Sequence, residues 1–275
     1  MSGIRIARVS GIPIHAHVTL LIVLPLMAMN MAQAASLSFA WGLAGAVGFF
    51  ASIALHELGH SWVALRKGCR VREIMLLPIG GVAQLDRMPA RPRDEILVSL
   101  AGPAVSLGLF GASRLLAVPA AEAGFHSAQR MLVLLGGTNL LLALFNLLPS
   151  FPMDGGRIFR AWLTPRLGYL GATRIASGVG RFMAVLFGVL ALRPFNPVLL
   201  VIALFIHQAA GAEYRMAQHR ESARAWPPFS PSSGAGMGSE NEITVGPPPY
   251  ARGSSTDPSS RTPRDRLGDL FKRWR

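Results

Sequence analysis

The chain has little charge and almost no cysteine for its size. Only 15% of its 275 residues are charged, against roughly 25% in an average soluble domain. Hydrophobic residues make up 51%, and the mean hydropathy is +0.39. The single cysteine, Cys69, excludes an internal disulfide and any metal site built from several cysteines. This composition is typical of a membrane protein and not of a soluble enzyme.

Acidic residues are especially scarce, with 14 Asp and Glu against 27 Lys and Arg, which gives a formal net charge of +13. Such an excess can indicate nucleic-acid binding. Here most of the arginines lie in loops on one presumed side of the hydrophobic segments, as in the cytoplasmic loops of membrane proteins. We therefore expect the lipid bilayer, and no nucleic acid, as a partner.

Six hydrophobic segments approach the roughly 20 residues that a membrane helix needs. They cover about 14–35, 38–67, 96–117, 131–148, 173–192 and 197–211. A signal peptide is the alternative for the first, because the start is basic and Ala32-Gln33-Ala34 resembles a cleavage site. We favour a retained helix. Six crossings predict a multi-pass protein of the cell membrane with both termini cytoplasmic.

Residues 70–88 are too interrupted to cross a membrane. Pro78, Gly80 and Gly81 break two short β-like runs, at 73–77 and 82–85. A hairpin or re-entrant loop fits, and such backbone is tolerated at membrane depth only where protein or water covers it. An open strand edge there could hold an extended peptide by strand addition. A purely structural hairpin is the alternative.

The last fifth of the chain differs in composition from the rest. Pro, Ser, Gly and Arg dominate from about residue 222, which predicts a disordered basic cytoplasmic tail over 221–275 after a membrane domain at 1–220. At its end, apolar residues at i, i+3, i+4 and i+7 predict either an amphipathic helix on the inner leaflet or a frayed end. These residues are Leu267, Leu270, Phe271 and Trp274.

The strongest chemical signal is His56-Glu57-Leu58-Gly59-His60, inside the second hydrophobic segment. On a helix, residues i and i+4 lie on one face, so His56 and His60 can bind one metal ion. Glu57, one step round the helix, can act as general base toward a zinc-activated water. The alternative is two helix histidines that serve only hydrogen bonding. It is disfavoured because three ionisable groups in a lipid-buried helix are costly and usually functional.

A third metal ligand is expected near residue 154. Two prolines end the fourth hydrophobic segment, and Gly155-Gly156 frees the backbone beside Asp154. Hydrolytic zinc commonly takes three protein ligands plus water, so Asp154 is the candidate. By local sequence alone, a helix N-cap role for Asp154 is equally favoured. Asn139 and Asn146, seven residues apart, are expected to share a helix face toward the bundle interior.

Together these stretches resemble the site-2 protease family of intramembrane zinc metalloproteases. The matching pieces occur in the family's order, and the pair HELGH with FNLLPSFPMDGGR is highly specific. They are GIPIHAH (11–17), HELGHSWVALRKG (56–68), LLPIGGVAQLDRMP (76–89), AGPAVS (101–106) and FNLLPSFPMDGGRIFRAW (145–162). Many relatives carry a PDZ-like insertion or tandem CBS domains, and we expect neither in this compact form.

The resemblance implies an all-α polytopic fold, with six transmembrane helices and a short re-entrant β-hairpin after the second. It implies one Zn²⁺ per chain held by His56, His60 and Asp154, with Glu57 as base and Asn146 as a donor to the oxyanion. It also implies a zinc endopeptidase that cleaves a transmembrane or membrane-proximal segment of another membrane protein, in regulated intramembrane proteolysis. The substrate strand would be held by Gly80, Gly81, Val82 and Ala83.

Three other classes of protein are alternatives to this interpretation. A metal-binding transporter or channel would need a continuous polar path, whereas the candidate residues gather at one level. A catalytically silent membrane scaffold is disfavoured because the base and all the ligands are present. A soluble zinc protease is excluded by the apolar segments.

Overall fold

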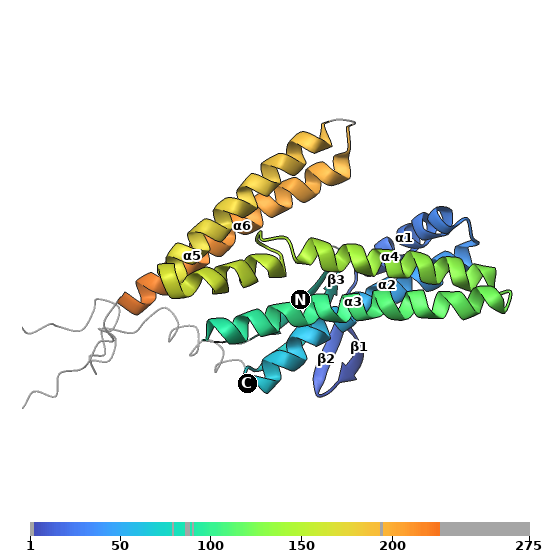
Figure 1. Ribbon diagram of the computed structural model, residues 1–275, viewed down its shortest axis with the longest axis horizontal. Coiled ribbons are helices and arrows are strands. Elements are labelled where there is room, and N and C mark those ends of the chain that lie inside the picture. Colours follow the sequence, from blue (N-terminus) through green and yellow to red (C-terminus); the bar gives the residue numbers. More distant parts are fainter. Residues whose placement is uncertain (1–2, 79, 86–88, 90, 193–194, 226–275) are drawn as a thin grey trace, which may run out of the picture. The chain divides into compact units, whose positions relative to one another are not determined.

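The computed structural model describes residues 3–78, 80–85, 89, 91–192 and 195–225 (Figure 1). All of these residues belong to the first of the two units into which the chain divides, Met1–Trp226. The predicted tail beyond residue 225, with its terminal amphipathic helix, lies outside the described residues. The last described helix continues to Ala225.

Helices account for most of the first unit. They are α1 (Leu20–Ala35), α2 (Phe39–Arg66), α3 (Pro92–Glu122), α4 (His126–Asn146), α5 (Asp154–Ala191) and α6 (Pro197–Ala225). Among the described residues, the five helices α2 to α6 are long and apolar enough to cross a membrane, whereas α1 has 16 residues and is shorter. The protein is therefore a mostly helical, multi-pass membrane protein, and predicted spans two to six each overlap one helix.

The first predicted span is wrong over its first residues. The helix begins only at Leu20, and Ile12–His17 form strand β2. The physical reason lies in the two-residue period of a strand: Ile12 and Ile14 are buried while Pro13 between them is less so. The structure is therefore not all-α.

A four-stranded sheet forms, in the order β1-β2-β3-β4. The strands are β1 (Gly3–Val9), β2 (Ile12–His17), β3 (Val71–Leu77) and β4 (Gly80–Leu85). β1 and β2 pair antiparallel, β2 and β3 parallel, and β3 and β4 antiparallel. The predicted hairpin after the second helix is confirmed as β3 and β4. This hairpin is part of a larger sheet, because β2 of the N-terminal hairpin pairs with β3. Strand β4 is therefore an edge strand of the sheet.

One face of the sheet packs on α1 and α2. Ile12, Ile14, Ile74 and Leu76 form a buried cluster with Leu20 of α1 and with Phe50 and Ile53 of α2. Because Ile53 lies one turn before His56, this core fixes the sheet beside the candidate metal ligands.

Helix α2 contacts α1, α3 and α4 closely. A Cβ added at Gly42 would meet the Ala28 carbonyl oxygen and the Ala32 side chain of α1. A Cβ at Gly59 would lie 2.9 Å from the Ala101 carbonyl oxygen of α3. Small residues at such crossings let helix backbones approach, as membrane packing favours.

Helix α4 meets α2 through a buried polar contact. The Asn139 side chain, 1% exposed, donates from Nδ2 to Ser52 Oγ at 3.1 Å. Asn139 thus faces the bundle, as its place on the helix predicted.

Helix α5 has two parts, because Gly168 has non-helical backbone angles (φ 69°, ψ 168°) that favour glycine. The second part pairs with α6, and α5 also packs against α3 (Figure 1). The first part begins at Asp154 and brings this residue toward α2.

Candidate metal centre

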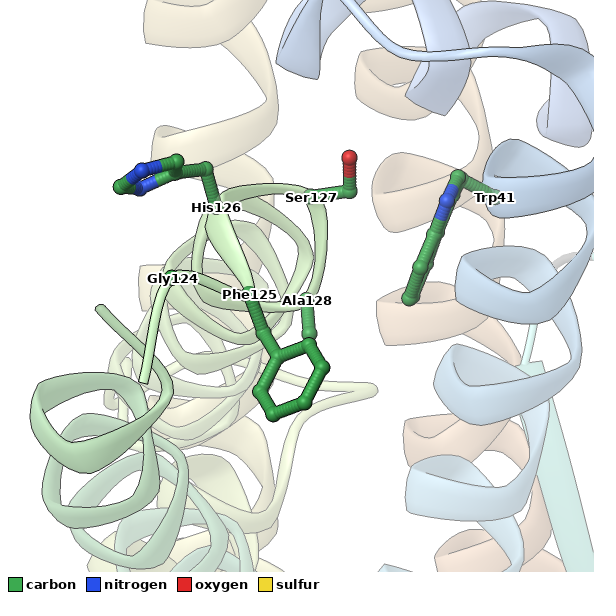
Figure 2. Close-up of a pocket in the computed structure, with 6 residues that line it drawn as sticks. All are labelled: Trp41, Gly124, Phe125, His126, Ser127 and Ala128. Atoms are coloured by element: carbon green, nitrogen blue, oxygen red, sulfur yellow. The ribbon is translucent and has the colours of Figure 1, made fainter. Parts of the chain in front are cut away.

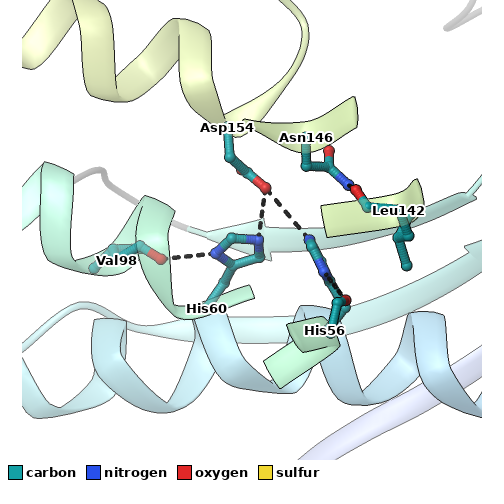
Figure 3. Close-up of polar contacts among 7 residues, drawn as sticks. His56, His60, Val98, Leu142, Asn146 and Asp154 are labelled. Carbon is teal, nitrogen blue, oxygen red and sulfur yellow. Dashed lines mark hydrogen bonds and ion pairs between the residues drawn. The ribbon is translucent and has the colours of Figure 1, made fainter. Parts of the chain in front are cut away.

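Three potential metal-binding atoms, from two helices that are far apart in the sequence, lie close together beside α3. Asp154 Oδ2 lies 3.3 Å from His56 Nε2 and 3.1 Å from His60 Nε2. Both histidines are buried, at 3% and 7% exposure. Figure 3 shows both rings and the Asp154 carboxylate converging from α2 and α5. Within the described part of the chain, these three residues form the one group of at least three histidine, cysteine or acidic side chains whose ligand atoms lie within 4.8 Å of one another.

The hydrogen bond made by Nδ1 of His60 determines whether Nε2 of the same ring donates or accepts. His60 Nδ1 lies 2.7 Å from the Val98 carbonyl oxygen, which can only accept, so His60 Nδ1 carries the proton. In neutral His60 the Nε2 atom is then a lone-pair acceptor that faces a carboxylate oxygen. Two acceptors at this distance repel each other unless a cation or a proton lies between them. Such a backbone hydrogen bond is how metal-binding histidines are usually oriented.

The donor separations fit tetrahedral zinc. Zinc bonds of about 2.0–2.1 Å at tetrahedral angles place neighbouring ligand atoms about 3.3 Å apart. The His56–Asp154 and His60–Asp154 separations of 3.3 and 3.1 Å match this value. Two imidazoles and one carboxylate form a donor set common in hydrolytic zinc sites and leave a fourth position open.

Helix α3 supports the site through three residues spaced four apart. Val98 binds His60 through its carbonyl, and Ser106 Oγ shares a 2.8 Å hydrogen bond with His56 Nδ1. Between them lies Gly102, where an added Cβ would come within 2.6 Å of His56 Nε2 and still closer to His60 Nε2. Gly102 therefore leaves open the space that the two histidine donors need.

The local backbone explains how Asp154 reaches the histidines. Asp154 is the first residue of α5, and the N-cap position belongs to Met153. A Cβ at Gly155 would collide with the carbonyl oxygens of Leu147 and Leu148, and one at Gly156 would lie 2.6 Å from the Ser150 carbonyl carbon. The two glycines allow the loop after α4 to fold tightly under the start of α5. The helix-cap alternative for Asp154 does not match this arrangement.

Glu57 lies between the histidines and strand β4. Its side chain is partly buried, and its carboxylate has no hydrogen-bond or ion-pair partner among the residues that the structure describes. A Cβ at Gly81 of β4 would lie 2.5 Å from Glu57 Cγ. The edge strand therefore passes directly beside this carboxylate.

Comparison with known proteins also supports a zinc-binding site in this chain. The family model "Peptidase family M50" matches residues 44–119 and 112–190. The chain is 37% identical over 220 residues to a zinc metalloprotease of Methanocaldococcus jannaschii, covering 78% of this chain and 62% of that protein. A Synechocystis protein also named as a zinc metalloprotease is 33% identical over 283 residues, covering 91% of this chain and 72% of that protein.

A solved structure shares the fold. The site-2 protease from Methanocaldococcus jannaschii matches with a TM-score of 0.57 and 34% identity, covering 78% of this chain and 95% of that one. The chain belongs to peptidase family M50, the site-2 protease family of zinc metalloproteases. Its candidate metal centre thus occurs in a fold of which such centres are typical.

In this M50 protein, Asn146 is the last residue of α4, close in sequence to Asp154. Its Nδ2 donates to the Leu142 carbonyl of its own helix at 3.0 Å, and Figure 3 shows the side chain turned toward Leu142. Of the four predicted substrate-binding residues, Gly81 lies beside Glu57. Val82 is 48% exposed, and Gly80 has a positive φ of 142°. Ala83 packs against the core between the sheet and α2.

Sequence reasoning assigned no role to several residues that surround this centre. AGPAVS was recognised as a motif, but the roles of Gly102 and Ser106 depend on which face of α3 meets α2. The buried ion pair between Glu95 and Arg160 was also missed, because the two residues lie 65 positions apart and charged side chains are mostly exposed.

A cavity of about 360 Å³ lies at a different place, between the start of α2 and the turn from α3 to α4. Trp41 and Phe125 flank it, while His126 points away from Trp41 (Figure 2). Trp41 precedes His56 by 15 residues, or about 22 Å along a helix. This cavity is therefore separate from the candidate metal centre.

Proposed function

We propose that this protein is an intramembrane zinc endopeptidase that cleaves a transmembrane or membrane-proximal segment of another membrane protein. The observation that carries the proposal is the convergence of His56, His60 and Asp154 inside apolar helices. The Glu57 carboxylate lies beside them, and it has no hydrogen-bond or ion-pair partner among the described residues. Membership of peptidase family M50 supports it.

We assign His56, His60 and Asp154 as the ligands of one zinc ion per chain. When bound, zinc supplies Lewis acidity that makes a water molecule nucleophilic near neutral pH. The Glu57 carboxylate accepts the proton of the attacking water and returns it to the leaving amine. Asn146 donates its amide N–H to the developing oxyanion. For this, its side chain rotates away from the Leu142 carbonyl, which it contacts at 3.0 Å.

Strand β4 is the proposed substrate-binding element. A transmembrane helix keeps its carbonyls in internal hydrogen bonds, so the scissile peptide must first become extended. The edge of β4 offers backbone groups to such a strand, and Gly81 places this edge against Glu57. A peptide added along residues 80–83 would run past the catalytic carboxylate.

The proposed topology has six crossings and both termini in the cytoplasm. Its weakest part is α1, whose 16 residues span about 24 Å, against the roughly 27–30 Å of a bilayer core. Accessibility labelling of single cysteines placed at Gly3 and Gly124, in a variant lacking Cys69, tests this topology. Labelling of both from the same side of the membrane would contradict it.

The test of function compares the membrane proteomes of cells with the wild-type protein and with Glu57→Gln. We expect a single-pass membrane protein to accumulate in the variant while the zinc content of the purified enzyme is unchanged. A Glu57→Gln variant that still cleaves with zinc bound would refute the assignment of Glu57. Uptake of metal into vesicles by wild type and variant alike would favour a transporter instead.

A further inference from the structure

Two opposite charges are buried together beside the candidate metal centre. Glu95 of α3 is 5% exposed and Arg160 of α5 is 2% exposed. Arg160 Nε donates to Glu95 Oε1 at 3.1 Å, and Arg160 Nη2 donates to the same oxygen. Burying such a pair gives little net stability, so stability alone is a poor reason to keep it.

Arg160 also contacts other elements. Its Nη1 lies 3.7 Å from Glu213 Oε2 of α6, and its guanidinium lies 5.1 Å from the Phe151 ring and 4.9 Å from the Tyr169 ring. Phe151 belongs to the loop that leads into Asp154, and Tyr169 follows the break in α5 at Gly168. Arg160 therefore links α3, α6, the loop before α5 and both parts of α5.

The pair joins the two helices that determine the geometry of the metal centre. Arg160 follows Asp154 by six residues on α5, or about 9 Å along the axis. Glu95 precedes Val98 by three residues on α3, and the Val98 carbonyl orients His60. A shift of α5 along α3 would therefore move the Asp154 carboxylate relative to the His60 ring.

We infer that Arg160 and Glu95 are a positioning pair that holds Asp154 in register with the two histidines. The inference rests on the proposed zinc site. The Arg160 guanidinium binds Glu95 Oε1 through two nitrogens and also contacts Glu213 and two aromatic rings, so its position is fixed from several elements. Position matters here because metal–ligand distances tolerate only about 0.2 Å of displacement.

The decisive variant is Glu95→Leu/Arg160→Met, which removes both charges of the buried pair. Glu213 loses its contact with Arg160, but its side chain is 23% exposed and can be solvated, so the fold is expected to survive. Zinc affinity of the purified full-length protein is measured by competition with a chelator, alongside the melting temperature. We expect zinc affinity to fall by about 10-fold or more, as for other residues that orient metal ligands, with the melting temperature close to wild type.

The matched control is Asp94→Asn. Asp94 neighbours Glu95 and pairs with Lys67 at 2.7 Å, but both partners are partly exposed and neither contacts α5 in the ion pairs described. This control is expected to bind zinc as the wild type does. If the double variant is not recovered folded, Glu95→Gln replaces it, with a smaller loss of zinc affinity expected.

Wild-type zinc affinity in the folded double variant, or in Glu95→Gln where that variant replaces it, would overturn the positioning role and leave the zinc site intact. An equal loss of zinc affinity in Asp94→Asn and in the Glu95 variant under test would overturn the positioning role as well. A wild-type protein that binds no zinc would instead overturn the proposed function, so the two failures are distinguishable.

Discussion

Replacing Gly102 with alanine should weaken metal binding while leaving the fold in place. The added methyl carbon would lie 2.5 Å from His60 Cε1 and 2.6 Å from His56 Nε2. Ordinary contacts between such atoms are about 3.5–4.0 Å. Either α3 or the histidine rings must therefore move by about 1 Å, several times the roughly 0.2 Å that metal–ligand distances tolerate.

The same substitution is favourable to the helix itself. Gly102 is interior to α3, where alanine is more stable than glycine by about 0.5–1 kcal/mol. This gain offsets part of the cost of the shifted contacts, so the variant is expected to fold. We expect its zinc affinity to fall by about 10- to 100-fold and cleavage to be lost at limiting zinc.

Gly108 provides a matched control on the same helix, because a Cβ there would have no neighbour within 4 Å. Zinc content is measured on both purified variants by atomic emission, with chelator competition for affinity and circular dichroism for the fold. Gly108→Ala should match the wild type. A folded Gly102→Ala protein that binds zinc as tightly as Gly108→Ala would refute the close approach of α3 to the two rings.

Three further substitutions separate the roles proposed around the site. Ser106→Ala removes the partner of His56 Nδ1, and chelator competition should show zinc affinity lowered by about 10-fold or more. Gly81→Ala places a methyl 2.5 Å from Glu57 Cγ, so a cleavage assay in vesicles should show a lower rate at unchanged zinc content. Asn146→Ala should lower kcat by about 10²–10³-fold with zinc retained, and an unchanged kcat would exclude the oxyanion role.

The parts of the site that follow local rules were predictable from the sequence. His56 and His60 share a helix face because of their spacing, and α2 forms where the second hydrophobic segment, 38–67, predicts it. Asp154 is different, since 98 residues separate it from His56. Local sequence left it undecided between a ligand and a helix cap, and only the resemblance to a family favoured the ligand. Its position depends on tertiary packing of the loop after α4.

The strand β2 was missed because a short apolar run does not distinguish a buried strand from the start of a helix. Ile14 was predicted to begin the first span, but Ile12 and Ile14 belong to a buried cluster with Ile74 and Leu76, which come about 60 residues later in the chain. Gly102 belongs to the AGPAVS piece, and local sequence gives no reason for a glycine there. The structure supplies the reason, because the rings of His56 and His60 on another helix lie against this position.

The most direct test of the central claim is zinc X-ray absorption spectroscopy on the purified full-length protein and on Asp154→Ala. The account predicts one zinc per chain, with two imidazole nitrogens and a carboxylate oxygen at about 2.0–2.2 Å. It also predicts loss of zinc or a changed spectrum in the variant. A wild-type protein without zinc, or a variant with the same zinc content and the same spectrum, would contradict it.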